Sequence, residues 1–578
     1  MKDILKFLKP YKKMVILAPL FMLFEAGAEL IQPKLMTRLI DQGVGTGDVG
    51  FISKIAIAMI LVVVVGIIGG MGCLYFASIV SQRAGTDMRK AIFAKIQEFS
   101  FHNIDTFKTP SLITRLTNDI TQVQLVIMMS LRLLIRAPLL AVGSVVMAFS
   151  INAKLALIFV CAVVLLAVTV GIIIKFAMPQ FKIMQEKLDN VNMVMRECLA
   201  GIRVVKAFVR GDYEIEKFQK VNNDYKDTSI HAFKIMVLVM PSMMLILNGS
   251  IIAILWFGYF QSYQGTIRPE EIMALVTYLM QMLMAMMMIG MALMMVSRAK
   301  VSTDRIFEVL DAEVDIVDAP EPKVPAKFQG EVAFKNVSFK YENGTGDNVL
   351  EDISFHINPG ETIGILGETG SGKSTLVNLL PRLYDVNNGA ILVDGVDVRD
   401  YQLSTLRKHV AVVLQETILF TGTIRDNIKW GKPDATEEEV IAAAKAAQAH
   451  EFITSFPEGY NTELGQKGVN VSGGQKQRIS IARALIQNPS IIIFDDSTSA
   501  VDSVTEKNIR ESLKEFHGSA TKLIIAQRIS SVREADKVLV LSGGKIVAEG
   551  NHNYLMETSK DYQEINASQL KREVMLDE

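Results

Sequence analysis

A short loop in the second half of the chain has the residue types and spacing that bind a phosphate. In "ETIGILGETGSGKSTLVNLL" (361–380) an apolar strand leads into Gly367-x-x-x-x-Gly372-Lys373-Ser374, and an amphipathic helix follows. In such a loop the glycines let backbone N–H groups surround the phosphates, the lysine reaches the terminal phosphates and the serine hydroxyl binds Mg²⁺. The start of the helix also favours an anion. We therefore predict a site for ATP and Mg²⁺ built from Gly367, Glu368, Thr369, Gly370, Ser371, Gly372, Lys373, Ser374 and Thr375.

A second stretch could bring carboxylates to the same nucleotide. In "IIIFDDSTSAVD" (491–502) an apolar strand ends in Asp495 and Asp496, and a Ser/Thr-rich turn follows. The second acid of such a run is usually a glutamate, because its carboxylate must reach a water molecule. Asp496 is one methylene shorter than glutamate, so the stretch predicts a nucleotide site with an unusual second acid.

Length and composition set the broad class of protein. The 578 residues are too many for a single hydrophobic core. Half of them are apolar, and the formal net charge is −1. The chain therefore has no excess of positive charge that would attract nucleic acid, and we do not expect nucleic acid as a partner. The three cysteines (Cys73, Cys161 and Cys198) suggest neither a disulfide framework nor a metal site.

The apolar residues are concentrated in the first half of the chain. Segments long enough to cross a bilayer lie at about 14–38, 54–80, 124–150, 155–178, 233–260 and 271–297. Lys and Arg gather at the N-terminus and in the 81–121 and 179–231 connections, whereas the other connections hold almost none. By the positive-inside rule we predict a multi-pass protein of the cell membrane with both termini in the cytoplasm.

Charged residues inside the predicted spans leave several interpretations open. Glu25 and Glu29 share one face of the first helix, which suits either a cation site or a structural hydrogen bond. We expect Arg132 and Arg136 to lie near the inner end of the third span and to snorkel to the interface. The last span has ten methionines between Met273 and Met295, which suits varied apolar ligands or plain packing.

The order of the motifs resembles a known family. "VSGGQKQR" (471–478) follows the phosphate loop by about a hundred residues and shortly precedes "IIIFDD". This arrangement resembles the signature of ATP-binding cassette (ABC) proteins, and six spans ahead of one cassette resemble an exporter half-transporter. The resemblance implies a membrane α-helical domain of six transmembrane helices with the type I ABC exporter fold, followed by an α/β P-loop nucleotide-binding domain. We expect the membrane domain at 1–310, a proline-containing linker at 311–330 and the cassette at 331–578.

The resemblance also implies roles for individual residues around the bound nucleotide. Tyr341 resembles the aromatic residue that stacks on adenine, and Gln415 the glutamine that touches Mg²⁺ and the attacking water. Asp495 matches the acid that holds Mg²⁺ through water. The metal site would thus consist of Ser374, Gln415 and Asp495, and the catalytic positions would be Asp496, Gln527 and Gln415.

Other matches imply contacts with a second cassette and with the membrane domain. Asp502 resembles a residue that communicates between the two ATP sites. Segments at 207–214 and near 104–115 resemble the coupling helices that press on the cassettes. The signature loop would close over the partner's ATP through Ser472, Gly473, Gly474 and Gln475.

Three positions depart from the family pattern. Asp496 replaces the glutamate that polarises water, Gln527 replaces a histidine that braces the γ-phosphate, and Gln466 replaces a glutamate ahead of the signature. The shorter acid moves its carboxylate back by roughly 1.5 Å, and a misplacement of about 1 Å costs on the order of a hundredfold in rate. We expect this chain's own ATP hydrolysis to be slow.

The chain thus combines a weak catalytic site with a phosphate loop and a signature that match the family pattern. This combination predicts a heterodimer. The chain resembles the degenerate-site subunit of bacterial heterodimeric multidrug exporters. Its partner in the bilayer would be a second half-transporter chain that carries glutamate and histidine at the catalytic positions and uses this chain's signature loop. The pair would export small amphipathic drugs or lipid-like compounds.

Two other functions remain as alternatives. One is a homodimeric lipid flippase or peptide exporter in which Asp496 suffices for hydrolysis. The other is a regulatory membrane ATPase that signals without transport. Co-purification with a second chain and dye uptake by inverted vesicles distinguish these functions.

Overall fold

The computed structural model describes residues 4–325, 327–341, 346–497 and 501–577. The chain divides into two units, which we call the helical unit and the α/β unit. The helical unit comprises Met1–Ile96 and Pro110–Ala312, and the α/β unit comprises Gln97–Thr109 and Glu313–Glu578.

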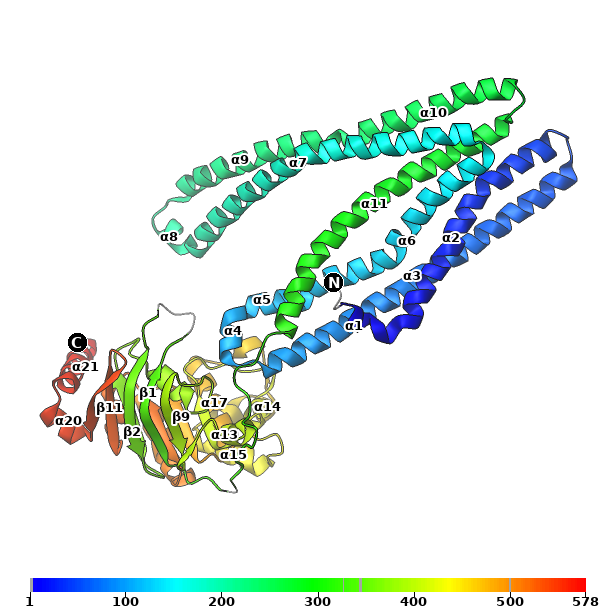
Figure 1. Cartoon of the computed structure of the whole chain (residues 1–578). Coiled ribbons are helices and arrows are strands. Elements are labelled where there is room, and N and C mark those ends of the chain that lie inside the picture. The colour runs from blue at the N-terminus through cyan, green and yellow to red at the C-terminus, as the bar shows by residue number, and fades with distance from the viewer. Residues whose placement is uncertain (1–3, 326, 342–345, 498–500, 578) are drawn as a thin grey trace. The chain divides into compact units, whose positions relative to one another are not determined.

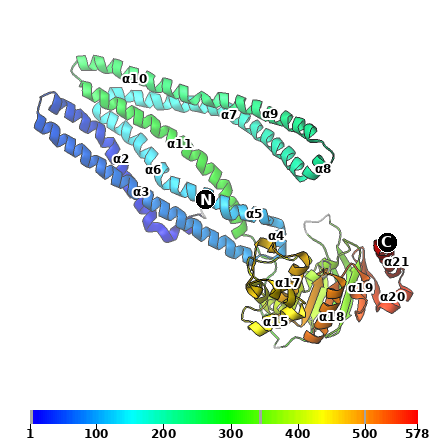
Figure 2. The same cartoon turned by 180° about the vertical axis from the view of Figure 1, so that it is seen from behind.

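Long helices form the helical unit (Figure 1). The α11 helix packs along α6, and α9 and α10 run beside α7, with the short α8 at the turn (Figures 1 and 2). The helices are α1 (Ile4–Leu8), α2 (Lys12–Arg38), α3 (Val49–Glu98), α5 (Thr109–Thr114), α6 (Ile120–Ile151), α7 (Ala153–Ala200), α8 (Ile202–Ala207), α9 (Gly211–Val237), α10 (Val239–Tyr263) and α11 (Pro269–Leu310).

Six of the helical stretches in the described chain are long and apolar enough to cross a membrane. They contain the six predicted segments almost entirely, but several are much longer, and α3 alone has 50 residues. At 1.5 Å per residue such a helix is about 75 Å long, which exceeds the roughly 30 Å of a bilayer core. Sequence hydropathy locates only the apolar part of each helix, because the polar extensions carry no such signal.

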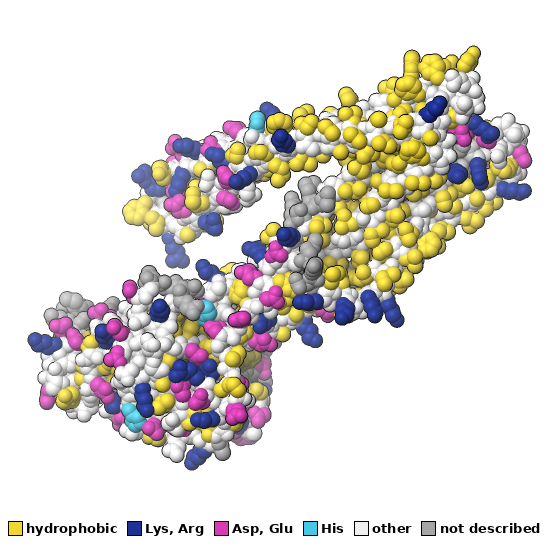
Figure 3. All heavy atoms as spheres, viewed as in Figure 1, with side chains coloured by type: hydrophobic (Ala, Val, Ile, Leu, Met, Phe, Trp, Pro, Cys, Tyr) yellow, Lys and Arg dark blue, Asp and Glu magenta, His cyan; other side chains and the backbone are white. Residues whose placement is uncertain are grey.

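The surface of these helices is suited to lipid. Large apolar side chains such as Ile60, Val164 and Leu245 are exposed, and Figure 3 shows hydrophobic side chains running almost continuously over the long helices. Charged side chains gather instead around the α8 end of the α7–α9 pair (Figure 3). An apolar patch of this extent is incompatible with water and indicates a membrane-embedded surface.

The α/β unit contains two main sheets. The larger sheet has the strand order β12-β11-β3-β10-β9-β6, in which all neighbours are parallel except the edge pair β11 and β12. An antiparallel sheet of order β2-β1-β4-β5 accompanies it. The strands are β1 (Val332–Phe339), β2 (Leu350–Ile357), β3 (Thr362–Gly367), β4 (Asn388–Val393), β5 (Val396–Asp397), β6 (Val410–Val413), β7 (Gly422–Thr423), β8 (Glu463–Leu464), β9 (Ile491–Asp495), β10 (Thr521–Ile525), β11 (Lys537–Ser542) and β12 (Lys545–Gly550).

Helices cover the larger sheet, and an apolar core fills the space between the layers. Ile365, Leu376 and Ile493 are fully buried in this core. Continuous apolar strands such as β9 are typical of parallel strands covered on both faces. The helices are α4 (Phe101–Phe107), α12 (Lys373–Leu379), α13 (Leu403–His409), α14 (Ile424–Lys429), α15 (Glu437–Ala446), α16 (His450–Ser455), α17 (Gly473–Leu485), α18 (Ser503–Phe516), α19 (Ile529–Val532), α20 (His552–Thr558) and α21 (Lys560–Asp577).

The segment Gln97–Thr109, which the sequence places in the membrane domain, groups with the α/β unit. Ser100 and Asn103 form a capping box that starts α4. The Ser100 hydroxyl donates to Asp315 Oδ1 at 2.8 Å, and the Asn103 amide donates to the Glu313 carbonyl at 3.0 Å. The amino-acid composition could not reveal this grouping, because it depends on polar contacts between residues that lie more than two hundred positions apart in the sequence.

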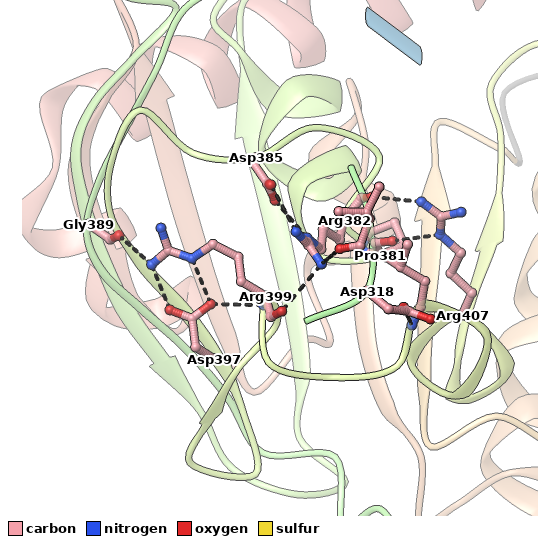
Figure 4. A network of polar contacts seen from close by, with 10 residues as sticks. Asp318, Pro381, Arg382, Asp385, Gly389, Asp397, Arg399 and Arg407 are labelled. Carbon is pink, nitrogen blue, oxygen red and sulfur yellow. Dashed lines mark hydrogen bonds and ion pairs between the residues drawn. The ribbon is translucent and has the colours of Figure 1, made fainter. Parts of the chain in front are cut away.

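A buried arginine fastens the start of the predicted linker to the α/β unit. Arg382 is 6% exposed, forms a two-point pair with Asp385 and donates to the carbonyls of Val317 and Arg399 (Figure 4). Asp318 accepts the backbone N–H of Leu403 at 2.7 Å. These contacts hold the chain at Val317 and Asp318, well ahead of β1, against the rest of the unit.

Arg382 gives a test of this attachment. Arg382→Met keeps an apolar stem but removes the hydrogen bonds of a charged group, which contribute about 1.5–3 kcal/mol. We expect the melting temperature of the α/β unit to fall by roughly 5 °C, given a domain of this size. Scanning calorimetry of the full chain measures the shift.

Arg425→Met is the matched control. Arg425 is 35% exposed, whereas Arg382 is 6% exposed, and Arg425 pairs with Asn461 and Glu437, so its loss should lower the melting temperature less. Equal shifts in the two variants would contradict the role given to Arg382.

Candidate nucleotide site

Four neighbouring parallel strands bring the predicted site residues to one edge of the larger sheet. The β3 strand ends at Gly367, β9 at Asp495 and β10 two residues before Gln527, while Gln415 follows β6 by two residues. Parallel strands present their carboxyl ends at the same edge, where ligands bind in open α/β sheets. Residues more than 150 positions apart therefore meet there.

The phosphate loop has a backbone that only glycine adopts without strain. Gly370 and Gly372 have φ values of +87° and +96°. A Cβ atom on Gly372 would lie 2.8 Å from Leu350 Cδ2 and 2.9 Å from the Val349 carbonyl oxygen. The loop thus passes close to its neighbours and turns its backbone toward the site.

Lys373 lies across this loop. Its Nζ donates to the carbonyl oxygens of Gly367 at 2.9 Å and Glu368 at 2.6 Å. Burial lowers the pKa of the Lys373 ammonium, while the carboxylates of Asp496 and Asp495 act in the opposite direction. A buried ammonium beside a glycine-rich loop is ready to bind an anionic oxygen.

The first acid of the strand end contacts the serine of the loop. The Ser374 hydroxyl donates to Asp495 Oδ1 at 2.9 Å, and Asp495 is 5% exposed. Burial raises the pKa of the Asp495 carboxyl, and the neighbouring charge of Asp496 adds to this rise.

The second acid is held by two amides. Asp496 Oδ2 accepts hydrogen bonds from Gln527 Nε2 at 2.8 Å and from Gln415 Nε2 at 3.2 Å. Asp496 has a φ of +47°, which places it in the left-handed region just beyond β9. Burial raises the pKa of its carboxyl, and the hydrogen bond from Gln527 opposes the rise.

A cavity of about 300 Å³ lies among these groups. It is lined by ten of the predicted site residues, namely Thr369, Gly370, Gly372, Lys373, Ser374, Thr375, Gln415, Asp495, Asp496 and Gln527. Gly367, Glu368 and Ser371 belong to the same loop but do not line the cavity.

Tyr341 lies next to the phosphate loop and lines a different cavity of about 710 Å³. Its hydroxyl is 3.1 Å from the Thr375 hydroxyl. The ring of Tyr384 meets the Tyr341 ring edge-on at 5.3 Å, and the Tyr384 hydroxyl donates to Asp105 of α4 at 2.8 Å. No local motif marks Tyr384, and Asp105 is predicted only as part of the coupling segment near 104–115, because only the packing of α4 brings the two side chains together.

The predicted signature residues lie apart from both cavities. Ser472 caps α17, and its hydroxyl accepts the N–H of Gln475 while the Gln475 side chain accepts the N–H of Ser472. Ser472 and Gly473 are exposed, and Gly474 and Gln475 are partly exposed. This helix N-terminus therefore faces outward from its own chain. Asp502 is likewise a helix cap, and it starts α18.

The two segments predicted as coupling helices differ in detail from the sequence expectation. The region near 104–115 contains the end of α4 and all of α5, separated at Lys108. Residues 207–214 cover the last residue of α8 (Ile202–Ala207), the turn after it and the start of α9, so most of the short helix precedes the predicted range. Val209, with a φ of +53°, lies in this turn.

The donors in the cavity fit Mg²⁺ together with phosphate. Ser374, Gln415 and Asp495 offer oxygen ligands, which Mg²⁺ prefers, and they leave room for phosphate oxygens and water. Within the described ranges no group of three or more His, Cys, Asp or Glu side chains could hold a metal by itself. The metal would thus be bound jointly by the chain and the nucleotide.

Comparison with known proteins decides the family. Residues 15–286 match the model of the ABC transporter transmembrane region, and residues 350–499 match the ABC transporter model. The ABC transporter ATP-binding protein YfiB of Bacillus subtilis is 41% identical, with 99% of each chain covered. The chain belongs to the ABC transporter family. Its α/β unit is therefore an ATP-binding cassette, and ATP is its nucleotide.

Other similar proteins identify the exporter type. The putative multidrug export ATP-binding/permease protein YgaD of Bacillus subtilis is 34% identical, with 98% of each chain covered. An ATP-dependent lipid A-core flippase of Syntrophus aciditrophicus is 32% identical, covering 99% of this chain and 95% of that one. The structure of a bacterial Atm1-family ABC exporter with ATP bound matches with a TM-score of 0.79 at 26% identity, covering 96% of this chain and 98% of that one. This ABC transporter has the exporter fold, with six membrane-spanning helices and an α/β nucleotide-binding domain, and is a multi-pass membrane protein.

Lys373→Met tests the nucleotide site. The variant keeps the packing of the stem but removes the ammonium, and charge-assisted contacts to phosphate are the strongest in such a site. We expect ATP affinity to fall by at least about tenfold, which corresponds to about 1.4 kcal/mol. Equilibrium binding of a fluorescent ATP analogue to the full chain measures this.

Lys335→Met is the control, because Lys335 is exposed on β1 and lines neither cavity. It should bind nucleotide like the unaltered chain. Unchanged affinity in Lys373→Met would show that the nucleotide lies elsewhere.

Proposed function

We propose that this chain is one subunit of a heterodimeric ABC exporter. It binds ATP at a catalytically weak site of its own and supplies its signature loop to the active site of a second, unlike half-transporter. The arrangement of Asp496 and Gln527 carries the proposal.

The position of the Asp496 carboxylate supports a weak site. Hydrolysis needs a carboxylate placed to polarise the attacking water, and phosphoryl transfer depends on positioning above all. Asp496 is one methylene short, and its Oδ2 already accepts two amide hydrogen bonds, from Gln527 and Gln415. These donors stabilise the carboxylate in its retracted position.

The second departure acts in the same direction. Gln527 reaches the cavity, but a glutamine amide is uncharged and cannot supply the positive charge that a histidine can carry beside the γ-phosphate. Its amide is directed at Asp496 at 2.8 Å. The side chains at the two catalytic positions are thus hydrogen-bonded to each other.

The parts that bind nucleotide support retention of ATP at this site. We assign Lys373 and the backbone of Gly367–Ser374 to the phosphates, and Tyr341 to the adenine ring. Ser374, Gln415 and Asp495 would hold Mg²⁺, which supplies charge neutralisation on the phosphates when bound. These residues match the family pattern, in contrast to Asp496 and Gln527.

The outward-facing signature supports the contribution to a partner. Ser472–Gln475 begin a capped 13-residue helix whose N-terminus is exposed. Helix N-termini bind anions through free N–H groups and the helix dipole. In the heterodimer this end would close over the γ-phosphate of ATP in the partner, whose glutamate and histidine would complete that site.

We further infer that both termini lie in the cytoplasm, on the basis of the basic connections. The exported compounds would be amphipathic drugs or lipid-like molecules, which agrees with the names of the similar proteins.

The similarity to a flippase favours one alternative, a homodimeric lipid flippase in which Asp496 suffices. We also place the membrane domain at 1–310, the linker at 311–330 and the cassette at 331–578.

The decisive measurement is ATP hydrolysis by the purified chain alone in lipid nanodiscs. We expect tight ATP binding with turnover far below 1 s⁻¹, the low end of usual enzyme rates. The double variant Asp496→Glu/Gln527→His should raise turnover by about a hundredfold, because it restores the carboxylate position and a side chain that can carry positive charge beside the γ-phosphate.

Two further variants control this experiment. Adding Lys373→Met to the double variant should abolish the gain, and Asp496→Asn alone should leave the low rate unchanged. Turnover near 1 s⁻¹ in the unaltered chain that is lost in Asp496→Asn would refute the heterodimer and support the homodimeric flippase.

A further inference from the structure

A largely apolar cavity with a few charged side chains in its wall lies in the membrane-spanning part of the helical unit, beside the contact of α2 with α3. The contact is close because α3 presents glycines to α2. A Cβ atom on Gly69 would lie 2.7 Å from the Glu25 backbone nitrogen, and one on Gly70 would lie 3.1 Å from Glu25 Oε2. The absence of side chains at these glycines gives room to the Glu25 carboxylate.

The cavity has a volume of about 520 Å³, which is within the range of small-molecule sites. Its apolar wall includes Val63, Ile67 and Met71 of α3, and its polar groups are Glu25, Glu29, Gln32 and Arg132. Glu25 lies about 20 Å along α2 from Lys12 at 1.5 Å per residue, which is well inside a bilayer core.

The two carboxylates share one arginine. Arg136 contacts Glu25 Oε1 at 3.4 Å and Glu29 Oε2 at 3.0 Å. The sequence expectation that Arg136 snorkels to the interface is therefore wrong, because two acids of α2 bind it within the span. One guanidinium balances only one of the two negative charges. Glu25 Oε2 is buried and has no hydrogen-bond partner within the described part of the chain.

Arg132 supplies the fourth charge. It lies one helical turn from Arg136 on α6 and lines the cavity, and it forms no ion pair with any described residue. The four side chains sum to zero charge, but one carboxylate oxygen and one guanidinium remain unmatched. Charged groups inside a membrane are costly unless they are paired, and they usually mark a functional site.

We propose that this cavity binds the headgroup of a zwitterionic amphiphile that carries an ammonium and a phosphate. The ammonium binds at Glu25 and the phosphate at Arg132, while the acyl chains lie along the apolar wall of α3. A ligand with a single charge would leave a net charge in a low-dielectric site, whereas a zwitterion leaves none. Arginine is well matched to phosphate oxygens.

The role of this site in transport rests on the export function proposed above, but binding itself is independent of ATP hydrolysis. Native mass spectrometry of the full chain, titrated with phosphatidylethanolamine, phosphatidylglycerol or tetraphenylphosphonium, measures three affinities. If phosphatidylethanolamine does not bind as expected, the role proposed for Asp496 still stands. Conversely, rapid ATP hydrolysis by the chain alone would refute that role without changing the lipid affinities.

We expect phosphatidylethanolamine to bind more tightly than the other two compounds. Glu25→Gln should weaken it about tenfold and leave phosphatidylglycerol unchanged, whereas Arg132→Gln should weaken both lipids about tenfold. Val63→Trp should weaken both lipids by filling the cavity while the charges stay in place. Glu216→Gln and Lys54→Gln, on exposed positions of α9 and α3, should change nothing.

Three results would overturn the proposal. Equal phosphatidylethanolamine affinity in all variants would place the lipid elsewhere. Tighter tetraphenylphosphonium binding that is lost in Glu25→Gln would identify a cation site. Tighter phosphatidylglycerol binding that depends on Arg132 alone would identify an anion site.

Discussion

The nucleotide site depends on the parallel pairing of β3, β10, β9 and β6. This pairing brings the phosphate loop, Gln527, Asp495, Asp496 and Gln415 to one edge, although they come from segments spread over more than 150 residues. A change of register or order among these strands would separate Ser374 from Asp495, whose hydrogen bond joins the loop to the strand end. The buried apolar strands that hold this order are therefore as necessary to the site as the polar residues at their ends.

The same edge contains both the residues that resemble the family pattern and the two that we propose depart from it. Lys373 donates to the Gly367 carbonyl and Ser374 donates to Asp495, and all three side chains line one cavity that suits a bound nucleotide with its metal. Asp496, Gln527 and Gln415 form a second set, in which two amides satisfy one short carboxylate. A stable, well-bonded carboxylate is poorly suited to polarise water, so the features that order this part of the site also account for the slow hydrolysis that we propose.

In the helical unit, charge placement follows the same logic of pairing in a low dielectric. Glu25 and Glu29 are stabilised by Arg136, which lies on another helix. The incomplete balance, with an unmatched carboxylate oxygen and Arg132 on the cavity wall, distinguishes a ligand site from a purely structural ion pair. At the other unit, the contacts of Ser100, Asn103 and Asp105 with the cassette tie α4 to the neighbourhood of Tyr341 through Tyr384.

The sequence by itself determined the features whose signal is local. The phosphate loop occupies eight consecutive residues, the strand acids are adjacent, and each span is a single apolar run, so the nucleotide site and the six membrane helices could be predicted. The tertiary structure decided the pairs that join distant segments. Arg136 with Glu25 and Glu29, Tyr384 with Asp105, and Gln527 with Asp496 depend on which helices and strands pack together, and that packing is set by the whole chain rather than by any one stretch of it.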